Sequence, residues 1–133
     1  LPKEGELHTC EIMDRHIENA SKFFKKSKYK DQIFIHRGEA LNTLEQFKIN
    51  SFDLVFIDAD KKNYIEYYNK SINLVKKDGI IILDNMLWGG SVLNPQDLDS
   101  KVLSELGTII CKDNRVINVL LPIRDGIMVC IKK

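Results

Sequence analysis

The feature that most constrains this chain is a repeated order of short apolar runs separated by helix-sized segments. Residues 54–57 and 80–83 are runs without a single polar side chain, which is typical of strands buried on both faces of a sheet. The segment between them repeats apolar residues at helical spacing, namely Ile65, Tyr68, Ile72 and Val75. We expect residues 77–79, Lys-Asp-Gly, to end that helix. A strand, a helix and a strand in this order predict parallel pairing.

The same alternation extends over the rest of the chain. The pattern predicts further strands at residues 7–12, 33–36, 116–121 and 127–131. It predicts further helices from Asp14, which would be the N-cap, from Ala40 to about Phe47, and over the segment that contains Leu98, Val102, Leu106 and Ile109. Only five residues separate the last two strands, so they are expected to form an antiparallel hairpin. The sequence therefore predicts an α/β fold, a mostly parallel doubly wound sheet in one domain over residues 1–133.

Composition excludes several classes of protein. The chain has 133 residues, of which 44% are hydrophobic and 29% are charged, as in a globular core. Lys and Arg total 20 and Asp and Glu total 19, so net charge gives no reason to expect nucleic acid or an anionic membrane as partner. No apolar run approaches the length of about 20 residues that a membrane span requires. Three widely spaced cysteines, Cys10, Cys111 and Cys130, predict neither disulfides nor a zinc site, which favours a reducing, cytoplasmic location.

Polar residues follow the apolar strands where a doubly wound sheet binds its ligands. Asp58 and Asp84 end consecutive strands, so on neighbouring strands they would lie about 5 Å apart. Two carboxylates at that distance repel each other unless a proton or a cation lies between them. Asn85 adds an amide oxygen, and an all-oxygen set favours Mg²⁺, Mn²⁺ or Ca²⁺ over zinc. The alternative is that both acids simply cap the helices that follow.

Three further positions have both a functional and a structural interpretation. Glu11 closes an early strand, where an acid can accept hydrogen bonds from ribose hydroxyls, although a solvated acid is the simpler interpretation. The stretch around Ala40, Gly38-Glu39-Ala40, could bring backbone close to a flat ring or could serve only as a turn. Lys61 could accept a proton from a metal-bound hydroxyl or stabilise the resulting oxyanion. As a neighbour of Lys62, it could equally be a surface lysine.

Other patterns have simpler explanations. Five lysines gather around one helix end, namely Lys22, Lys25, Lys26, Lys28 and Lys30. They could face RNA, but a solvated helix end explains them with fewer assumptions. Trp88 stands in a Gly-Gly loop, where it could wall a pocket for a flat substrate or cover the sheet edge. Arg124-Asp125-Gly126 is most simply the turn of the closing hairpin.

Three motifs together resemble one known family. Residues 52–64, FDLVFIDADKKNY, resemble the "FDxxFxDADKxNY" signature of cation-dependent O-methyltransferases, the caffeoyl-CoA and catechol O-methyltransferase-like group that uses S-adenosylmethionine (SAM). Residues 84–92, DNMLWGGSV, resemble its "DNxLWxGxV" segment, and residues 120–126, LLPIRDG, its closing "LLPIxDG". The order and spacing of the three agree over essentially the whole chain. The resemblance implies a Rossmann-like class I methyltransferase fold.

The resemblance also implies roles for the residues at the strand ends. Asp58, Asp84 and Asn85 would hold a divalent cation. Lys61 matches the lysine next to the reacting hydroxyl, with Asp58 beside it as a second catalytic residue. The implied reaction is transfer of a methyl group to one of two vicinal hydroxyls on a small catechol-like phenol, the hydroxyls being bound to the cation.

A second set would bind the cofactor. By the same resemblance Glu11 binds the cofactor ribose, Ala40 lies beside the adenine, and Asp58 and Asp60 make further cofactor contacts. Family members are usually dimers. The alternatives are a methyltransferase of the same fold that modifies a hydroxylated uridine of tRNA, and an inactive fragment that serves as a folded or interaction module.

The resemblance also implies a departure from the family. Family members carry a segment before the position that matches Leu1, with the first strand and a Gly-rich "ExGxxxGxS" loop that holds the methionine end of the cofactor. The chain begins without Met and without that motif, so we expect a fragment, a trimmed product or a rearranged form. Such a chain would bind the cofactor poorly by itself, because the absent strand would lie in the middle of the sheet.

Overall fold

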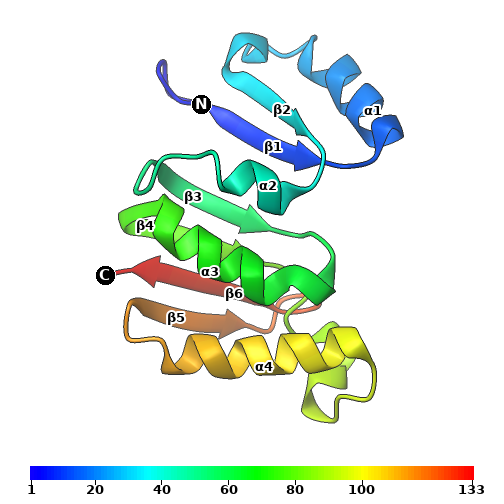
Figure 1. Cartoon of the computed structure of the whole chain (residues 1–133), viewed down its shortest axis with the longest axis vertical. Helices are drawn as coiled ribbons and strands as arrows, with labels where there is room; N and C mark the ends of the chain where they lie inside the picture. Colours follow the sequence, from blue (N-terminus) through cyan, green and yellow to red (C-terminus); the bar gives the residue numbers. More distant parts are fainter. The chain divides into compact units, whose positions relative to one another are not determined.

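The computed structural model describes residues 1–133, which divide into two compact units, residues 1–46 and 47–133 (Figure 1). The elements in chain order are β1 (Leu7–Glu11), α1 (Asp14–Phe24), η1 (Lys30–Gln32), β2 (Ile33–Arg37), α2 (Ala40–Leu44), β3 (Phe52–Ile57), η2 (Lys61–Asn63), α3 (Tyr64–Leu74), β4 (Val75–Leu83), η3 (Trp88–Leu93), α4 (Leu98–Lys112), β5 (Val116–Leu121) and β6 (Ile127–Lys132). The α/β class is confirmed. A single domain over the whole chain stays a prediction.

The N-terminal unit is a parallel pair of strands with a helical crossover. β1 pairs with β2 from Leu7 opposite Ile33 to Glu11 opposite Arg37, and α1 connects them. The prediction that Asp14 caps α1 is wrong. The N-cap is Met13 and makes no side-chain cap, whereas Asp14 is the first helical residue, where its charge favours the positive end of the helix dipole.

The C-terminal unit is a mixed sheet with the strand order β3-β4-β6-β5. β3 and β4 are parallel, joined by the crossover helix α3. β6 is antiparallel to both β4 and β5, so the predicted closing hairpin is confirmed. Because Ile57 is paired with Leu83, the residues that follow these two strands leave the sheet side by side.

Helices cover one face of this sheet. α3 and α4 lie across the same side in Figure 1, and they pack on each other and on the strands. The fully buried side chains that the two helices contribute to the core are Tyr64, Tyr68, Ile72, Leu103, Leu106 and Ile110. On α4, Asp97 is the N-cap and accepts a hydrogen bond from the Ser100 amide at 2.9 Å. Through Tyr64, this core reaches the ends of β3 and β4.

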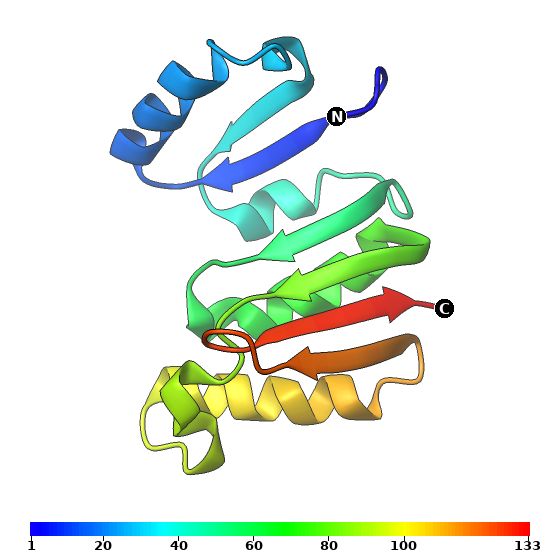
Figure 2. The same ribbon diagram turned by 180° about the vertical axis from the view of Figure 1, so that it is seen from behind.

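Within the C-terminal unit, no helix covers the opposite face of the sheet (Figure 2). Leu54 and Phe56 are 49% and 57% exposed, so the prediction that this strand is buried on both faces is wrong for this chain. The strand register continues the same face through Ile80 and Ile82 of β4. An apolar run of sequence shows that both faces suit burial, but it does not show that a second layer is present.

Two element boundaries also differ from the expected ones. α3 ends at Leu74, and Val75 already belongs to β4. The Lys77-Asp78-Gly79 stretch lies within β4 and does not end the helix; Asp78 there has a left-handed φ of 62°. α2 is also short, so Phe47 lies outside it. No helix has both the length and the apolar character needed to cross a membrane.

Candidate active site

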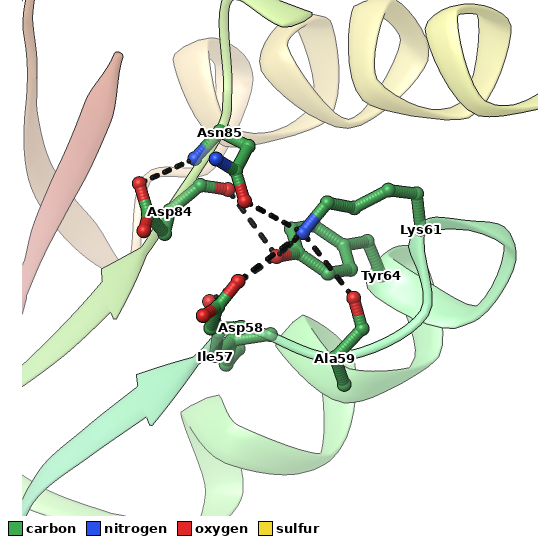
Figure 3. Close-up of polar contacts among 7 residues, drawn as sticks. All are labelled: Ile57, Asp58, Ala59, Lys61, Tyr64, Asp84 and Asn85. Carbon is green, nitrogen blue, oxygen red and sulfur yellow. Dashed lines mark hydrogen bonds and ion pairs between the residues drawn. The ribbon is translucent and has the colours of Figure 1, made fainter. Parts of the chain in front are cut away.

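The ends of β3 and β4 bring three predicted residues together (Figure 3). The Asp84 amide donates a hydrogen bond to the Ile57 carbonyl at 3.0 Å, which extends the parallel pairing by one step. Asp58 and Asp84 therefore come directly after two strands that are hydrogen-bonded up to their ends. The next residue, Asn85, has a left-handed φ of 58°, and its amide donates to Asp84 Oδ1 at 2.7 Å. This turn places the Asn85 side chain opposite Asp58.

Lys61 is buried between these strand ends, with only 8% of its side chain exposed. Its ammonium faces four oxygen atoms, which are Tyr64 Oη at 2.5 Å, Asn85 Oδ1 at 2.9 Å, the Ala59 carbonyl at 3.2 Å and Asp58 Oδ1 at 3.4 Å. A surface lysine would not be held in this way. The sequence-based alternative of a solvated Lys61 is therefore wrong, because the short η2 turn directs the side chain inward.

Tyr64 is a residue of the site for which the sequence analysis proposed no role. It is fully buried, and its hydroxyl lies 3.3 Å from the Ile57 carbonyl and 3.2 Å from that of Asp84 while it accepts from Lys61. Burial, and then the charge of Asp58, raise the pKa of the Tyr64 hydroxyl, so it keeps its proton. The signal was its position three residues after Lys61, where a helical turn brings the two side chains together.

Aromatic rings line the same cluster. The Lys61 ammonium lies 4.4 Å from the centre of the Tyr64 ring and 5.6 Å from the centre of the Trp88 ring. Both distances lie within the range of cation–π attraction. Trp88 has a left-handed φ of 49° and is half-buried. Trp88 thus lies beside the strand-end cluster, and the interpretation that it walls a pocket for a flat substrate stays a prediction.

Asp60 follows the cluster but faces the start of α3. One carboxylate oxygen accepts from the Tyr67 hydroxyl at 2.7 Å, and the other accepts from the side-chain amide of Asn63 at 2.7 Å. Each carboxylate oxygen still has a second lone pair. Asp60 therefore makes contacts that hold the turn, and its predicted contact with the cofactor stays a prediction.

Glu11 and Ala40 belong to the N-terminal unit. Glu11 Oε1 accepts from the amides of Ile12 and Met13 at 2.8 Å each, and Oε2 lies 3.1 Å from His16 Nδ1. These contacts, the Met13 amide first, lower the pKa of the Glu11 carboxyl. Ala40 is the first residue of α2. The predicted cofactor set is thus split between two units, and it stays a prediction.

The donor atoms at the strand ends fit a hard cation. Asp58 and Asp84 offer carboxylates and Asn85 an amide oxygen, which are the ligands that Mg²⁺, Mn²⁺ and Ca²⁺ prefer. No group of three or more His, Cys, Asp or Glu side chains in the structure could hold a metal ion. A site here would therefore need the amide oxygen as well as the two acids, and zinc would find neither thiolate nor imidazole.

Solved structures with the same fold define the class. An O-methyltransferase of Bacillus cereus in complex with S-adenosylhomocysteine (SAH) aligns with a TM-score of 0.90 at 26% identity over 100% of this chain. An SAH-bound methyltransferase of Podospora anserina aligns with a TM-score of 0.86 at 27% identity over 96% of it. The fold is that of the class I SAM-dependent methyltransferases.

Sequence comparison gives the family within that class. A caffeoyl-CoA O-methyltransferase of Eucalyptus globulus is 35% identical over 142 residues, and one of Medicago sativa is 32% identical over 143, each covering 98% of this chain. The O-methyltransferase family model matches residues 1–133. The chain belongs to this O-methyltransferase family, as the three motifs predicted.

The match covers only part of each relative. The chain spans 58% of the length of the two plant enzymes. It spans 65% of the Bacillus cereus chain and 61% of the Podospora anserina chain. Membership of the family is therefore established for residues 1–133, and activity is a separate question.

Proposed function

We propose that this protein is a divalent-cation-dependent O-methyltransferase that uses SAM to methylate one of two vicinal hydroxyls on a small catechol-like phenol. The observation that carries the proposal is the buried Lys61 ammonium, which is in contact with both Asp58 and Asn85. The residue that we propose as general base therefore lies in one cluster with two of the proposed cation ligands. The names of the plant relatives make caffeoyl-CoA the first acceptor to try.

In this proposal the residues at the strand ends hold the two reactants in place. Asp58, Asp84 and Asn85 would hold the cation, and Glu11, Ala40, Asp58 and Asp60 would bind the cofactor. When bound, the cation lowers the pKa of a chelated hydroxyl, and SAM supplies an electrophilic methyl group on its sulfonium. The half-buried ring of Trp88 offers a flat apolar surface on which an aromatic acceptor can stack.

Lys61 would take the proton of the reacting hydroxyl. Its ammonium has three N–H bonds, and the two shortest contacts are with Tyr64 and Asn85. To act as a base, Lys61 must first release one ammonium proton to solvent; the resulting amine keeps two N–H donors for these partners and has one lone pair for the acceptor. The O–H bond of the phenol then breaks as an N–H bond forms at Nζ. The raised pKa of Tyr64 keeps its hydroxyl protonated, so Tyr64 cannot serve as the base.

Cation binding by the chain tests the ligand set without any need for turnover. Asp84→Ala should weaken Mn²⁺ binding at least about tenfold in a calorimetric or paramagnetic-resonance titration, because one charged ligand is lost. Asp53→Ala is the matched control, since Asp53 is an exposed acid of β3 that pairs with Lys76 at 2.7 Å. Equal Mn²⁺ affinity in wild type and Asp84→Ala would remove Asp84 from the ligand set.

Cofactor binding tests the other half of the proposal. Titration of SAM into the chain should show binding that is weakened by Glu11→Ala and unchanged by Glu18→Ala, an exposed acid of α1. Where SAM binds, methyl transfer to caffeoyl-CoA should require Mg²⁺ and should be abolished by Lys61→Met. Transfer that continues after removal of divalent cations with a chelator would contradict the proposed chemistry.

One observation supports tRNA as an alternative acceptor. The five lysines of residues 22–30 are all exposed, so a polyanion could reach them, as methylation of a tRNA base would require. Binding of tRNA that weakens steeply with added salt would favour this alternative. The predicted dimer and the predicted cytoplasmic location stay predictions.

A further inference from the structure

The turn between β5 and β6 does more than close the hairpin. It makes three hydrogen bonds to the loop that follows β4, and Figure 2 shows the turn running across that loop. The Met86 amide donates to the Gly126 carbonyl at 3.0 Å, and the Leu87 amide donates to the Asp125 carbonyl at 2.8 Å. The Gly89 amide donates to the Asp125 side chain, Oδ1, at 2.6 Å.

Close approach of the two backbones requires glycine at position 126. Gly126 has a left-handed φ of 83°. A Cβ atom built there would lie 2.5 Å from Leu87 Cγ and 2.9 Å from the Leu87 backbone nitrogen. The backbone contact cannot be relieved by a side-chain rotation. The glycine is therefore needed to bring the turn against the loop.

The three bonded amides flank the two site residues of that loop. Met86 follows Asn85, and Gly89 follows Trp88. Asn85 and Trp88 both have left-handed backbone, with φ values of 58° and 49°. Asparagine tolerates this conformation, but a bulky residue such as Trp88 keeps it only when the surroundings enforce it. The Met86, Leu87 and Gly89 amides donate hydrogen bonds to Gly126 and Asp125, and these bonds hold the backbone after Asn85 and on both sides of Trp88.

We infer that Asp125 is a positioning residue, which with Gly126 fixes the loop that carries Asn85 and Trp88. Asp125 makes no hydrogen bond or ion pair with Lys61, Asp58 or Asn85, so we expect it to act through the loop. The support itself is independent of the proposed function, whereas its effect on a cation rests on the assignment of Asn85 as a ligand.

Three variants test the inference. Asp125→Ala removes the acceptor for the Gly89 amide, and Asp125→Asn keeps an oxygen at that position. Arg124→Asn is the matched control, because Arg124 is an exposed residue of the same turn whose left-handed φ of 52° asparagine tolerates. Trp88 is the only tryptophan of the chain, so its fluorescence reports on the loop directly.

Asp125→Ala should speed hydrogen exchange at the Gly89 amide at least about tenfold, since the amide loses a charge-assisted hydrogen bond. It should also lower the fluorescence anisotropy of Trp88 and weaken Mn²⁺ binding about tenfold, as is usual when a group that orients a metal ligand is removed. Asp125→Asn should bring the exchange rate, the anisotropy and the Mn²⁺ affinity most of the way back to their wild-type values. Arg124→Asn should match wild type in all three.

The inference would be overturned if Asp125→Ala lowered the unfolding temperature but left Gly89 exchange and Trp88 anisotropy unchanged, because the role would then be structural only. If Asp125→Ala fails to fold, the wild-type protein provides the test. Exchange of the wild-type Gly89 amide at the rate of an unstructured chain would also overturn the inference. Absence of Mn²⁺ binding in wild type would count against the proposed metal site alone, because the exchange and fluorescence results do not involve metal.

Discussion

The two units differ in how their predicted site residues are supported. In the C-terminal unit, Asp58, Lys61 and Asp84 stand at strand ends above a core of fully buried side chains. In the N-terminal unit, Ile17 and Thr43 are the only buried residues. The predicted metal and lysine residues are therefore held by a packed core, whereas the predicted cofactor residues Glu11 and Ala40 depend on a strand pair and local hydrogen bonds. The predicted residues of the two units therefore differ in what stabilises them.

Matched leucine substitutions should show this difference most strongly. Leu106→Ala should lower the free energy of unfolding by about 2–5 kcal/mol, because Leu106 is fully buried on α4. Leu7→Ala, at a leucine of β1 that is 43% exposed, should cost less than about 1 kcal/mol. Urea denaturation followed by circular dichroism measures both. Equal costs would mean that the N-terminal unit has a core as effective as that of the C-terminal unit.

Acid should weaken the C-terminal unit through Asp113. The guanidinium of Arg115 bonds this carboxylate at 2.7 Å and lowers the pKa of Asp113 well below its usual range. A carboxyl whose pKa is lowered on folding stabilises the protein above its unfolded pKa of about 4, and this stabilisation is lost as the pH falls further. Asp113→Asn should therefore lower the unfolding free energy by about 2 kcal/mol at pH 7. Its difference from wild type should shrink below pH 4, which chemical denaturation across pH 2–7 would measure.

Glu11→Gln is the counterpart of Asp113→Asn in the other unit. The pKa of Glu11 is also lowered, chiefly by the Met13 amide, so the sign of the pH dependence is the same. Glu11 is only part-buried, and water screens its contacts. We expect its effect at pH 7 to be smaller than that of Asp113→Asn. A larger effect would reverse the ranking of the two units.

Sequence patterns predicted the parts of the fold that depend on local spacing. The runs at residues 54–57 and 80–83 located two parallel strands, and the polar residues after them located the cluster at the strand ends. The exposure of Leu54 was not predictable, because burial depends on whether another layer is present. Nor could spacing show that Leu74 ends α3, since Val75 continues the same apolar pattern into the strand.

Contacts between distant parts of the chain were also beyond prediction. The contact of Asp125 with Gly89 joins residues that are 36 apart, and a turn motif predicts only its own local geometry. Tyr64 was visible as a residue of a motif, but its hydrogen bonds to two strand ends depend on the strand order. The roles of the predicted residues came from resemblance to a family, whereas the burial of Lys61 came from the structure.

A smaller effect separates two tyrosines within the C-terminal unit. Tyr64 and Tyr68 are both fully buried on α3, and burial raises the pKa of each hydroxyl. The Tyr68 hydroxyl donates to Asp113 at 2.9 Å, away from the strand ends, whereas that of Tyr64 accepts from Lys61. Tyr64→Phe and Tyr68→Phe should each lower the unfolding free energy by about 1–2 kcal/mol, because each removes a buried hydrogen bond.

Only Tyr64→Phe should alter Lys61. Tyr64→Phe removes the shortest contact of the Lys61 ammonium and should make this group more accessible. Acylation of Lys61, measured by mass spectrometry, should therefore become several-fold faster, while Lys62 is acylated at its wild-type rate. Tyr68→Phe should leave Lys61 labelling unchanged. If both variants raised labelling equally, general loosening of α3 would explain the result, and Tyr64 would have no particular part in holding the lysine.

The smallest effect belongs to the surface of the N-terminal unit. Arg37 pairs with Asp14 at 2.6 Å, but both side chains are more than 60% exposed. An exposed pair contributes about 0–1 kcal/mol and is screened by salt. Asp14→Asn should therefore change the local opening free energy of α1, measured by amide exchange, by less than about 1 kcal/mol, and less in 0.5 M salt. A larger loss that salt leaves unchanged would contradict this expectation, because neither an exposed ion pair nor a charge at the helix N-terminus resists salt screening.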